Sequence, residues 1–173
     1  MKKVKMWKLA VLMLTVSTQV SYASEMSASG TVLIAAPTSL NSPTNQGVWF
    51  INPTTKAFSL NLPALSANKV YEGWIVDDCT GKKVSTGLFR NNGSIDSDAA
   101  GKYAGPLALN FPPAPGSDFV KLGQDITDGG HHVVVTIEPY PDSDPSPSGV
   151  VVLRVTIPEA TQVGTVLTLE SNE

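Results

Sequence analysis

Short apolar segments separated by glycine and proline constrain the fold of this chain more than any other feature of its sequence. The chain of 173 residues contains 14 Gly and 13 Pro, which lie between the apolar segments rather than in one tract. The segments are rich in β-branched and aromatic residues, and no window beyond the N-terminal region has helical periodicity. This pattern predicts an all-β domain.

Eight segments are expected to form strands. Alternation is cleanest over residues 56–62, where Phe58, Leu60 and Leu62 share one face. Residues 70–77 are apolar on both faces, which is typical of a central strand. The expected strands are residues 30–36, 47–52, 56–62, 70–77, 83–90, 131–138, 150–157 and 163–169.

Turn-forming residues separate these segments. Residues 52–55 and 78–81 are predicted to form tight turns. Residues 139–149 contain four prolines and form a loop too short for a helical crossover, so strands 131–138 and 150–157 should pair antiparallel. Residues 91–130 are expected to be one long Gly/Pro-rich connection, partly ordered, with one or two short strands.

We predict an Ig-like two-sheet antiparallel β-sandwich, because seven to nine short strands with alternating inward residues fit that architecture. A closed barrel is the alternative, and periodicity does not decide between the two. The domain is expected to be a monomer. The residues expected in the core are Phe58, Leu60, Trp74, Val76, Leu88, Val135, Ile137, Leu153 and Val155.

The N-terminus has the pattern of a signal peptide. Four lysines precede a short apolar run over residues 9–16, and the small residues Ser21 and Ala23 suit signal peptidase. The run is shorter than the roughly 20 apolar residues of a membrane-spanning helix. We therefore expect residues 1–23 to be a signal peptide and residues 24–173 to form one domain in the periplasm or outside the cell.

Charge and cysteine content narrow the range of partners. Without residues 1–23 the chain has eight Lys and Arg against 15 Asp and Glu, a net charge of −7. Nucleic acid and anionic membrane surfaces are therefore unfavourable partners, because both require cationic patches. Cys79 is the only cysteine, which excludes a disulfide within the chain, and it is expected to be a partly buried apolar residue.

Four ordered blocks of sequence carry a family resemblance. They are Leu-Pro-Ala-Leu at 62–65 leading into Tyr-Glu-Gly-Trp at 71–74, Val-Ser-Thr-Gly-Leu-Phe at 84–89, Thr-Ile-Glu-Pro at 136–139, and Pro-Ser-Gly at 147–149. These blocks resemble the C-terminal extracytoplasmic domain of the anti-sigma-K factor family. The resemblance implies a sensory or structural domain without assigned chemistry. The sigma-binding segment and membrane helix of that family have no counterpart here, so we expect a stand-alone exported domain.

The titratable residues do not form a recognisable catalytic or metal-binding pattern. His131 and His132 are adjacent in a strand and should point to opposite faces, which disfavours a shared metal. Asp96 and Asp98, and Asp142 and Asp144, have spacing found in calcium loops. However, the twelfth residue from Asp96 is Leu107, so the EF-hand pattern fails. Solvated turns are favoured over an irregular calcium site.

Glu72 and Glu138 are the remaining candidates for chemistry, because they could approach each other if their strands are neighbours. Structural hydrogen bonds are the favoured role for both. Trp49, Trp74 and Tyr71 could form an aromatic platform for a ligand, although core packing is favoured. We assign no catalytic, cofactor-binding or metal-binding residue and no cofactor.

The expected function is that of a non-catalytic extracytoplasmic binding or sensory module, with an unknown extracytoplasmic protein or small ligand as partner. The alternatives are a structural envelope protein and a carboxylate-dependent hydrolase. The connection 91–130 is the first place to look for a binding surface, because loops on a rigid scaffold commonly carry recognition.

Overall fold

The computed structural model describes residues 27–37, 46–94, 114–119 and 123–172, and these residues form strands, turns and loops without a helix. No helix in this described part is long and apolar enough to cross a membrane. The expected signal peptide lies outside the described residues. The strands are β1 (Ser29–Ile34), β2 (Gly47–Trp49), β3 (Leu60–Asn61), β4 (Lys69–Asp77), β5 (Lys83–Phe89), β6 (Gly116–Asp118), β7 (His131–Pro139), β8 (Val151–Ile157) and β9 (Thr165–Ser171).

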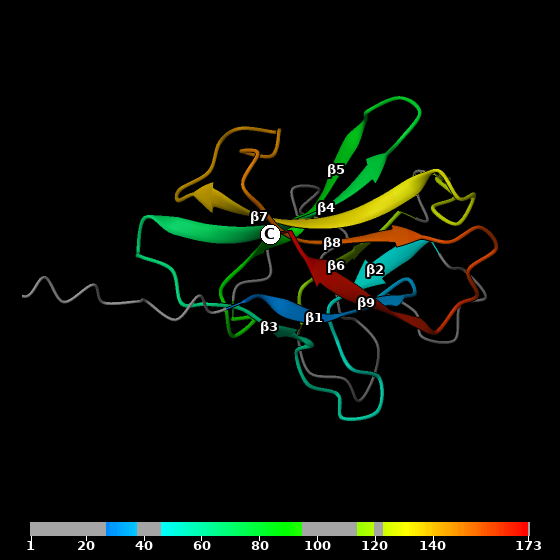
Figure 1. Ribbon diagram of the computed structural model, residues 1–173, viewed down its shortest axis with the longest axis horizontal. Coiled ribbons are helices and arrows are strands. Elements are labelled where there is room, and N and C mark those ends of the chain that lie inside the picture. Colours follow the sequence, from blue (N-terminus) through cyan, green and yellow to red (C-terminus); the bar gives the residue numbers. More distant parts are fainter. Residues whose placement is uncertain (1–26, 38–45, 95–113, 120–122, 173) are drawn as a thin grey trace, which may run out of the picture.

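All strand pairs are antiparallel, in the order β5-β4-β7-β8-β9-β1-β2-β6, with β3 paired to β1. Figure 1 shows β4, β7 and β8 in one layer above β1, β2 and β9. The strands β5 and β6, at the two ends of this order, contact each other, so the sheet is nearly closed into a barrel. The all-β class is confirmed. The Ig-like division into two sheets stays a prediction, because β8 and β9 connect the layers through two residue pairs.

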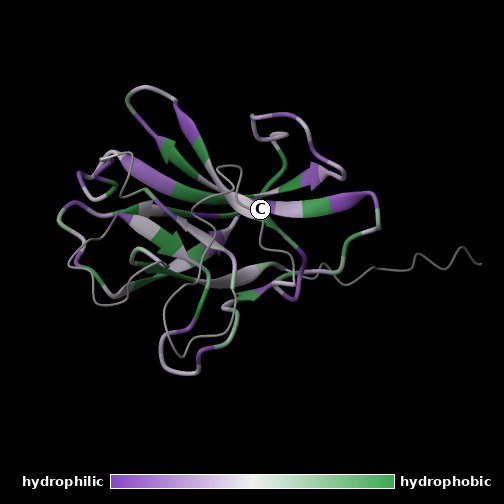
Figure 2. Cartoon of the chain, turned by 180° about the vertical axis from the view of Figure 1, so that it is seen from behind, coloured by the Kyte–Doolittle hydropathy of each residue, from purple (hydrophilic) through white to green (hydrophobic). Residues whose placement is uncertain are grey.

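The core lies between the two layers, where hydrophobic side chains of the strands face one another. Figure 2 shows hydrophobic and hydrophilic bands alternating along the strands. The rings of Phe50, Tyr71 and Phe89 pack together in this core. The centroid of the Phe89 ring lies 5.5 Å from that of Phe50 and 6.1 Å from that of Tyr71. A smaller cluster of Leu33, Ala35, Trp49, Ile51 and Ala114 is separate from this core.

The predicted core is correct for most strands and wrong for two. Leu60, Val135 and Leu153 are buried in the core, and Phe58, Ile137 and Val155 pack against it. On β4, however, Tyr71 and Ile75 face this core, so Trp74, which is buried as predicted, and the half-buried Val76 belong to the opposite face. On β5, Phe89 fills the core and Leu88 is only half-buried. β4 is apolar on both faces, and the register shift between Gly73 and Trp74 puts both Val84 and Phe89 of β5 on the core side, so alternation could not identify the inner face.

The predicted strands are mostly present, and the antiparallel pairing of β7 with β8 is confirmed. The expected strand over 56–62 is reduced to β3 and an isolated bridge between Ile51 and Phe58. The expected strand over 47–52 likewise shortens to β2. Within the long connection 91–130, β6 is a short strand as predicted, while residues 95–113 and 120–122 lie outside the described residues.

The turn at 52–55 is stabilised by the Asn52 side chain, whose Oδ1 accepts hydrogen bonds from the backbone N–H of Thr54 and Thr55 at 2.9 and 3.0 Å. Asp77 does the same for the turn at 78–81, where its Oδ1 accepts the N–H of Cys79 and Thr80, both at 2.9 Å. Both predicted turns are therefore confirmed, and the Asx hydrogen bonds explain them.

Gly73 is required where β4 crosses the core. A Cβ at this position would lie 2.1 Å from Thr86 Oγ1 and 2.8 Å from the Phe50 ring. Only a residue without a side chain lets β4 approach these groups so closely.

We therefore expect Gly73→Ala to destabilise the domain by at least about 1–3 kcal/mol, the usual cost of overpacking a core. Gly130→Ala is the matched control, because the nearest atom to its added Cβ, Asp128 Oδ1, lies 3.4 Å away, an ordinary contact. Urea unfolding of the two variants measures the difference. Equal stabilities would contradict the close packing at Gly73.

Candidate functional site

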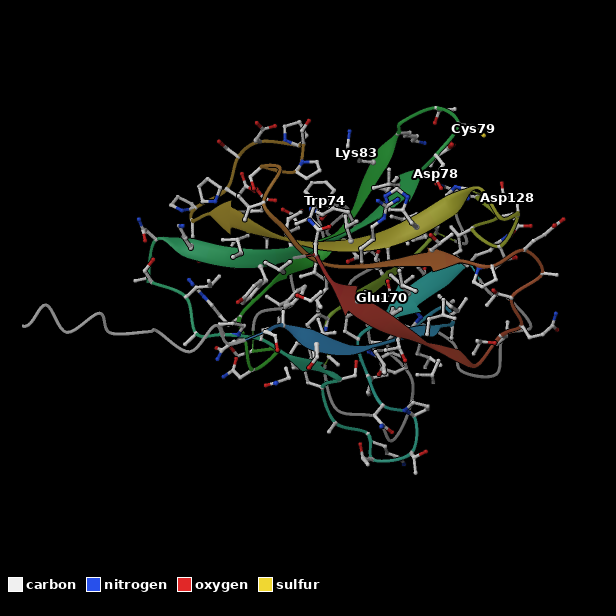
Figure 3. The ribbon with its side chains drawn as sticks, viewed as in Figure 1. Trp74, Asp78, Cys79, Lys83, Asp128 and Glu170 are labelled. Carbon is white, nitrogen blue, oxygen red and sulfur yellow. The ribbon has the colours of Figure 1, made fainter. Side chains whose placement is uncertain are left out.

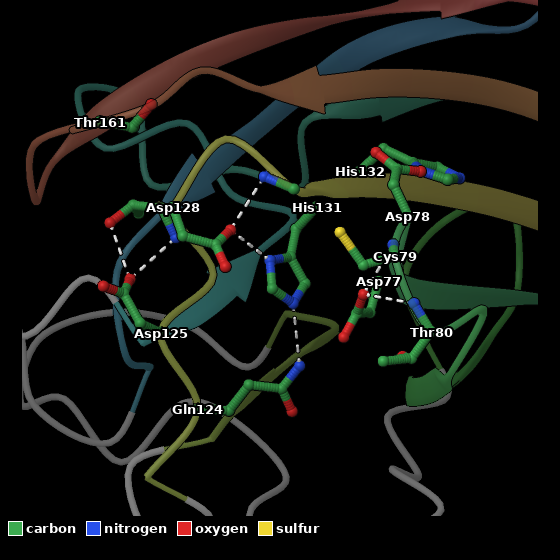
Figure 4. A network of polar contacts seen from close by, with 12 residues as sticks. Asp77, Asp78, Cys79, Thr80, Gln124, Asp125, Asp128, His131, His132 and Thr161 are labelled. Carbon is green, nitrogen blue, oxygen red and sulfur yellow. Dashed lines mark hydrogen bonds and ion pairs between the residues drawn. The ribbon is translucent and has the colours of Figure 1, made fainter.

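A network of polar contacts lies at the start of β7 (Figure 4). His131 is buried, and its Nδ1 lies 2.7 Å from Asp128 Oδ1 while its Nε2 lies 3.2 Å from Gln124 Nε2. Because the Gln124 amide nitrogen can only donate, this geometry corresponds to the tautomer with the proton on Nδ1. The pKa of Asp128 is lowered by hydrogen bonds from the Gly130 N–H and from His131. The network therefore holds the loop before β7 against the strand.

His132 points to the other face of β7, as adjacent strand residues do. Its Nδ1 lies 2.6 Å from Asp78 Oδ1, but the two atoms do not have hydrogen-bond geometry, so this contact is an ion pair only when His132 is protonated. The two histidines therefore have separate carboxylate partners. Among the described residues no group of three or more His, Cys, Asp or Glu side chains could hold a metal ion.

Cys79 lies at the tip of the β4–β5 hairpin, as Figure 3 shows. It is exposed, so the expectation of a partly buried side chain is wrong. The reason is the Asx turn at Asp77, which places Cys79 in the second position of a tight surface turn.

Glu72 and Glu138 lie on the outer face of the sheet, on neighbouring strands. Glu72 is the register partner of Thr136, two residues from Glu138, so the two carboxylates are diagonal neighbours. Both are almost fully buried, with 4% and 2% exposure. The sequence expectation that they could approach each other is therefore confirmed.

Glu138 fixes the loop between β7 and β8. Both of its carboxylate oxygens accept the Ser148 N–H, at 3.0 and 2.9 Å. Thr136 donates its hydroxyl to Glu138, and Trp74 donates its indole N–H to Thr136 at 2.9 Å. The Ser148 hydroxyl also donates to the Ile137 carbonyl at 2.6 Å. A continuous chain of hydrogen bonds thus runs from Trp74 to the loop.

Glu72 has an unusual environment for a carboxyl group. Burial and, to a smaller extent, the charges of Asp142 and Glu138 together raise its pKa to about 7, although the hydrogen bond from the Ser85 hydroxyl lowers it. A carboxylic acid with such a pKa can act as a general acid in glycosidases. Here, however, Glu72 is buried and hydrogen-bonded to Ser85, while Glu138 is occupied by Ser148 and Thr136. These positions favour the structural role that we expected for both residues.

The three aromatic candidates are all buried, so Trp49, Trp74 and Tyr71 form no exposed platform. Trp74 packs on the outer face of β4, above β7 in Figure 3. Asp96 and Asp98 lie outside the described residues. Asp142 and Asp144 each accept the backbone N–H two residues further on, at 2.9 Å, which is the turn role that we favoured.

Two hollows adjoin at the barrel end that carries the β7–β8 loop. One, of 380 Å³, is lined mainly by Pro63, Leu65, Tyr71, Ile137 and Val150–Val152. The other, of 360 Å³, is lined by Asn68, Lys69, Ile137, Glu138, Pro139, Ser148 and Val150. Both hollows share Ile137 and Val150, and we call them together the apolar hollow.

Large hydrophobic side chains remain exposed beside this hollow. Val150 is 54% exposed and Tyr140 is 42% exposed. The Arg90 guanidinium lies 4.6 Å from the centre of the Tyr140 ring and covers part of it. Sequence reasoning missed this surface, because its walls come from segments that are distant in the chain, such as Leu65, Ile137 and Val150.

We expect Glu138→Ala to release the β7–β8 loop and to cost about 1–3 kcal/mol, because Thr136 and the Ser148 N–H lose a buried acceptor. Glu170→Ala is the control, since this glutamate lies exposed on β9. Limited proteolysis between residues 140 and 148, with denaturant unfolding, measures both effects. Equal cleavage in the two variants would contradict the anchoring role of Glu138.

Comparison with known proteins adds no relative: no protein-family model, no curated protein and no solved structure matches this chain.

Proposed function

We propose that this chain is an exported, non-catalytic binding or sensory module that recognises a partner protein outside the cytoplasm through the apolar hollow. The observation that carries this proposal is the exposure of Val150 between two adjoining, largely apolar depressions. Exposed apolar patches next to concave surface commonly mark interaction sites on soluble domains.

The chemistry of the hollow favours an apolar side chain in an extended segment as its ligand. Its walls combine Pro63, Leu65 and Ile137 with the polar edges of Asn68 and Ser148. Such a mixture buries an apolar group while backbone and side-chain polar groups set its orientation. The scaffold beneath it is the β7–β8 pair, which is rigidly hydrogen-bonded.

The resemblance to the outer domain of anti-sigma-K factors supports the same class of function. Under this proposal the domain shares that family's extracytoplasmic module without its sigma-binding part, and its layers pack as in an Ig-like sandwich. A structural envelope protein is the second candidate. A carboxylate-dependent hydrolase ranks below both, because Glu72 and Glu138 are buried and hydrogen-bonded.

The surface can be tested by photo-crosslinking in the native host. A benzophenone side chain at position 150 should crosslink to a specific protein in the periplasmic or extracellular fraction. Position 163 is the matched control, because Val163 is also an exposed valine but lies in the β8–β9 turn. If the benzophenone at position 150 gives no crosslinked product, or the same products as at position 163, this binding surface is refuted.

Export is tested separately, by N-terminal sequencing of the protein from its host. We expect the mature chain to begin at Ser24, because Ser21 and Ala23 suit cleavage after Ala23. An intact Met1 on membrane-bound material would show that the segment is an anchor instead.

A further inference from the structure

The loop between β7 and β8 is attached to the sheet at three points. At its start, the Tyr140 N–H donates to the Asn68 carbonyl at 2.9 Å. At its end, Ser148 is held by Glu138 and by the Ile137 carbonyl. Between these anchors, Asp142 reaches the buried carboxyl group of Glu72.

The middle attachment requires a proton. Asp142 Oδ2 is buried and has no hydrogen-bond donor, while Asp142 Oδ1 accepts the Asp144 N–H. Glu72 lies within hydrogen-bonding reach of Asp142. Two ionised carboxylates can only accept, so they repel each other, whereas one shared proton makes a charge-assisted hydrogen bond between them.

The surroundings of Glu72 contain no compensating cation in the described part of the chain. Ser85 faces it from β5, Glu138 from β7 and Asp142 from the loop. On its own strand the same outer face carries Val70 and Trp74, which are buried and apolar. Both ion pairs among the described residues involve histidines at the start of β7, away from these carboxyl groups.

We propose that the Glu72–Asp142 pair is a proton-operated latch, which closes the β7–β8 loop over the outer face of β4 and β7 and opens it when the proton is lost. A divalent cation between the two carboxylates, in place of a proton, is disfavoured. Among the described residues, no group of three or more His, Cys, Asp or Glu side chains could hold a metal ion. The latch does not depend on the proposed function, although Ser148 and Val150 also line the apolar hollow and would move with the loop.

The direction of the pH dependence follows from the pKa of Glu72. Burial and neighbouring negative charges raise this pKa from its ordinary value of 4.5 to about 7. An acid whose pKa is raised in the closed state stabilises that state below its ordinary pKa, and the stabilisation is lost as pH rises through the raised value. The loop is therefore closed at pH 5 and opens as pH rises through about 7.

Hydrogen exchange of the mature domain, corrected for intrinsic rates, tests this inference. Protection of the Asp144 and Ser148 amides should be about tenfold lower at pH 8.5 than at pH 5. Glu72→Gln should keep the loop protected at both pH values, because the Gln amide donates permanently to Asp142. Asp142→Asn should also keep the loop protected at both pH values, because its amide can donate to Glu72. It replaces Glu72→Gln in the experiment if that variant folds poorly.

Glu170→Gln is the control and should retain the wild-type pH dependence, because Glu170 is exposed on β9. Protection that is independent of pH in the wild type would overturn the latch. So would a pH dependence that persists unchanged in Asp142→Asn. Neither result bears on crosslinking at position 150, so failure of the latch is distinguishable from failure of the proposed binding surface.

Discussion

The antiparallel pairing of β4 with β7 is the constraint on which the rest of the structure depends. The two strands are in register from Lys69–Pro139 to Asp77–His131, over the whole length of each. One face of this pair supplies Tyr71, Ile75 and Val135 to the core. The other face places Glu72 beside Glu138, and the two ends carry the histidine network and the apolar hollow. A change of register by one residue would exchange the two faces and destroy all of these sites together.

Burial of the two glutamates is tolerated because each has specific hydrogen-bond donors. Glu138 accepts the Ser148 N–H and the Thr136 hydroxyl, and therefore satisfies the requirement that a buried carboxylate be hydrogen-bonded. Glu72 has the Ser85 hydroxyl but faces further negative charge from Asp142. Burial, followed by the charges of Asp142 and Glu138, raises the pKa of Glu72 to about 7, and the loop that carries Asp142 is therefore the element that we propose responds to pH.

Sequence patterns predicted the fold where one periodicity was dominant and failed where two competed. Val135 and Leu153 were correctly expected in the core, because both lie on strands with a clear alternation. Trp74 is buried as expected, but on the outer face, because β4 is apolar on both faces. Leu88 was placed in the core although Phe89 fills it, because the register shift between β4 and β5 changes which residues of β5 face inward. The hollow beside the exposed Val150 was not foreseen, because it is formed by segments that only the tertiary structure brings together, such as those of Leu65 and Ile137. The approach of Glu72 to Glu138 was foreseen only on the condition that their strands were neighbours.

The sequence by itself determined the all-β class, the β7–β8 hairpin and the turns at Asn52 and Asp77. Each of these depends on local preferences: β-branched residues favour extended backbone, and Asx side chains bond to the backbone two or three residues further on. Only the tertiary structure decided that the sheet curls until β5 and β6 contact each other, that Gly73 packs against Phe50, and that Asp142 reaches Glu72. These contacts join residues distant in the chain, and their geometry arises from the combined twist and register of the nine strands in the described residues.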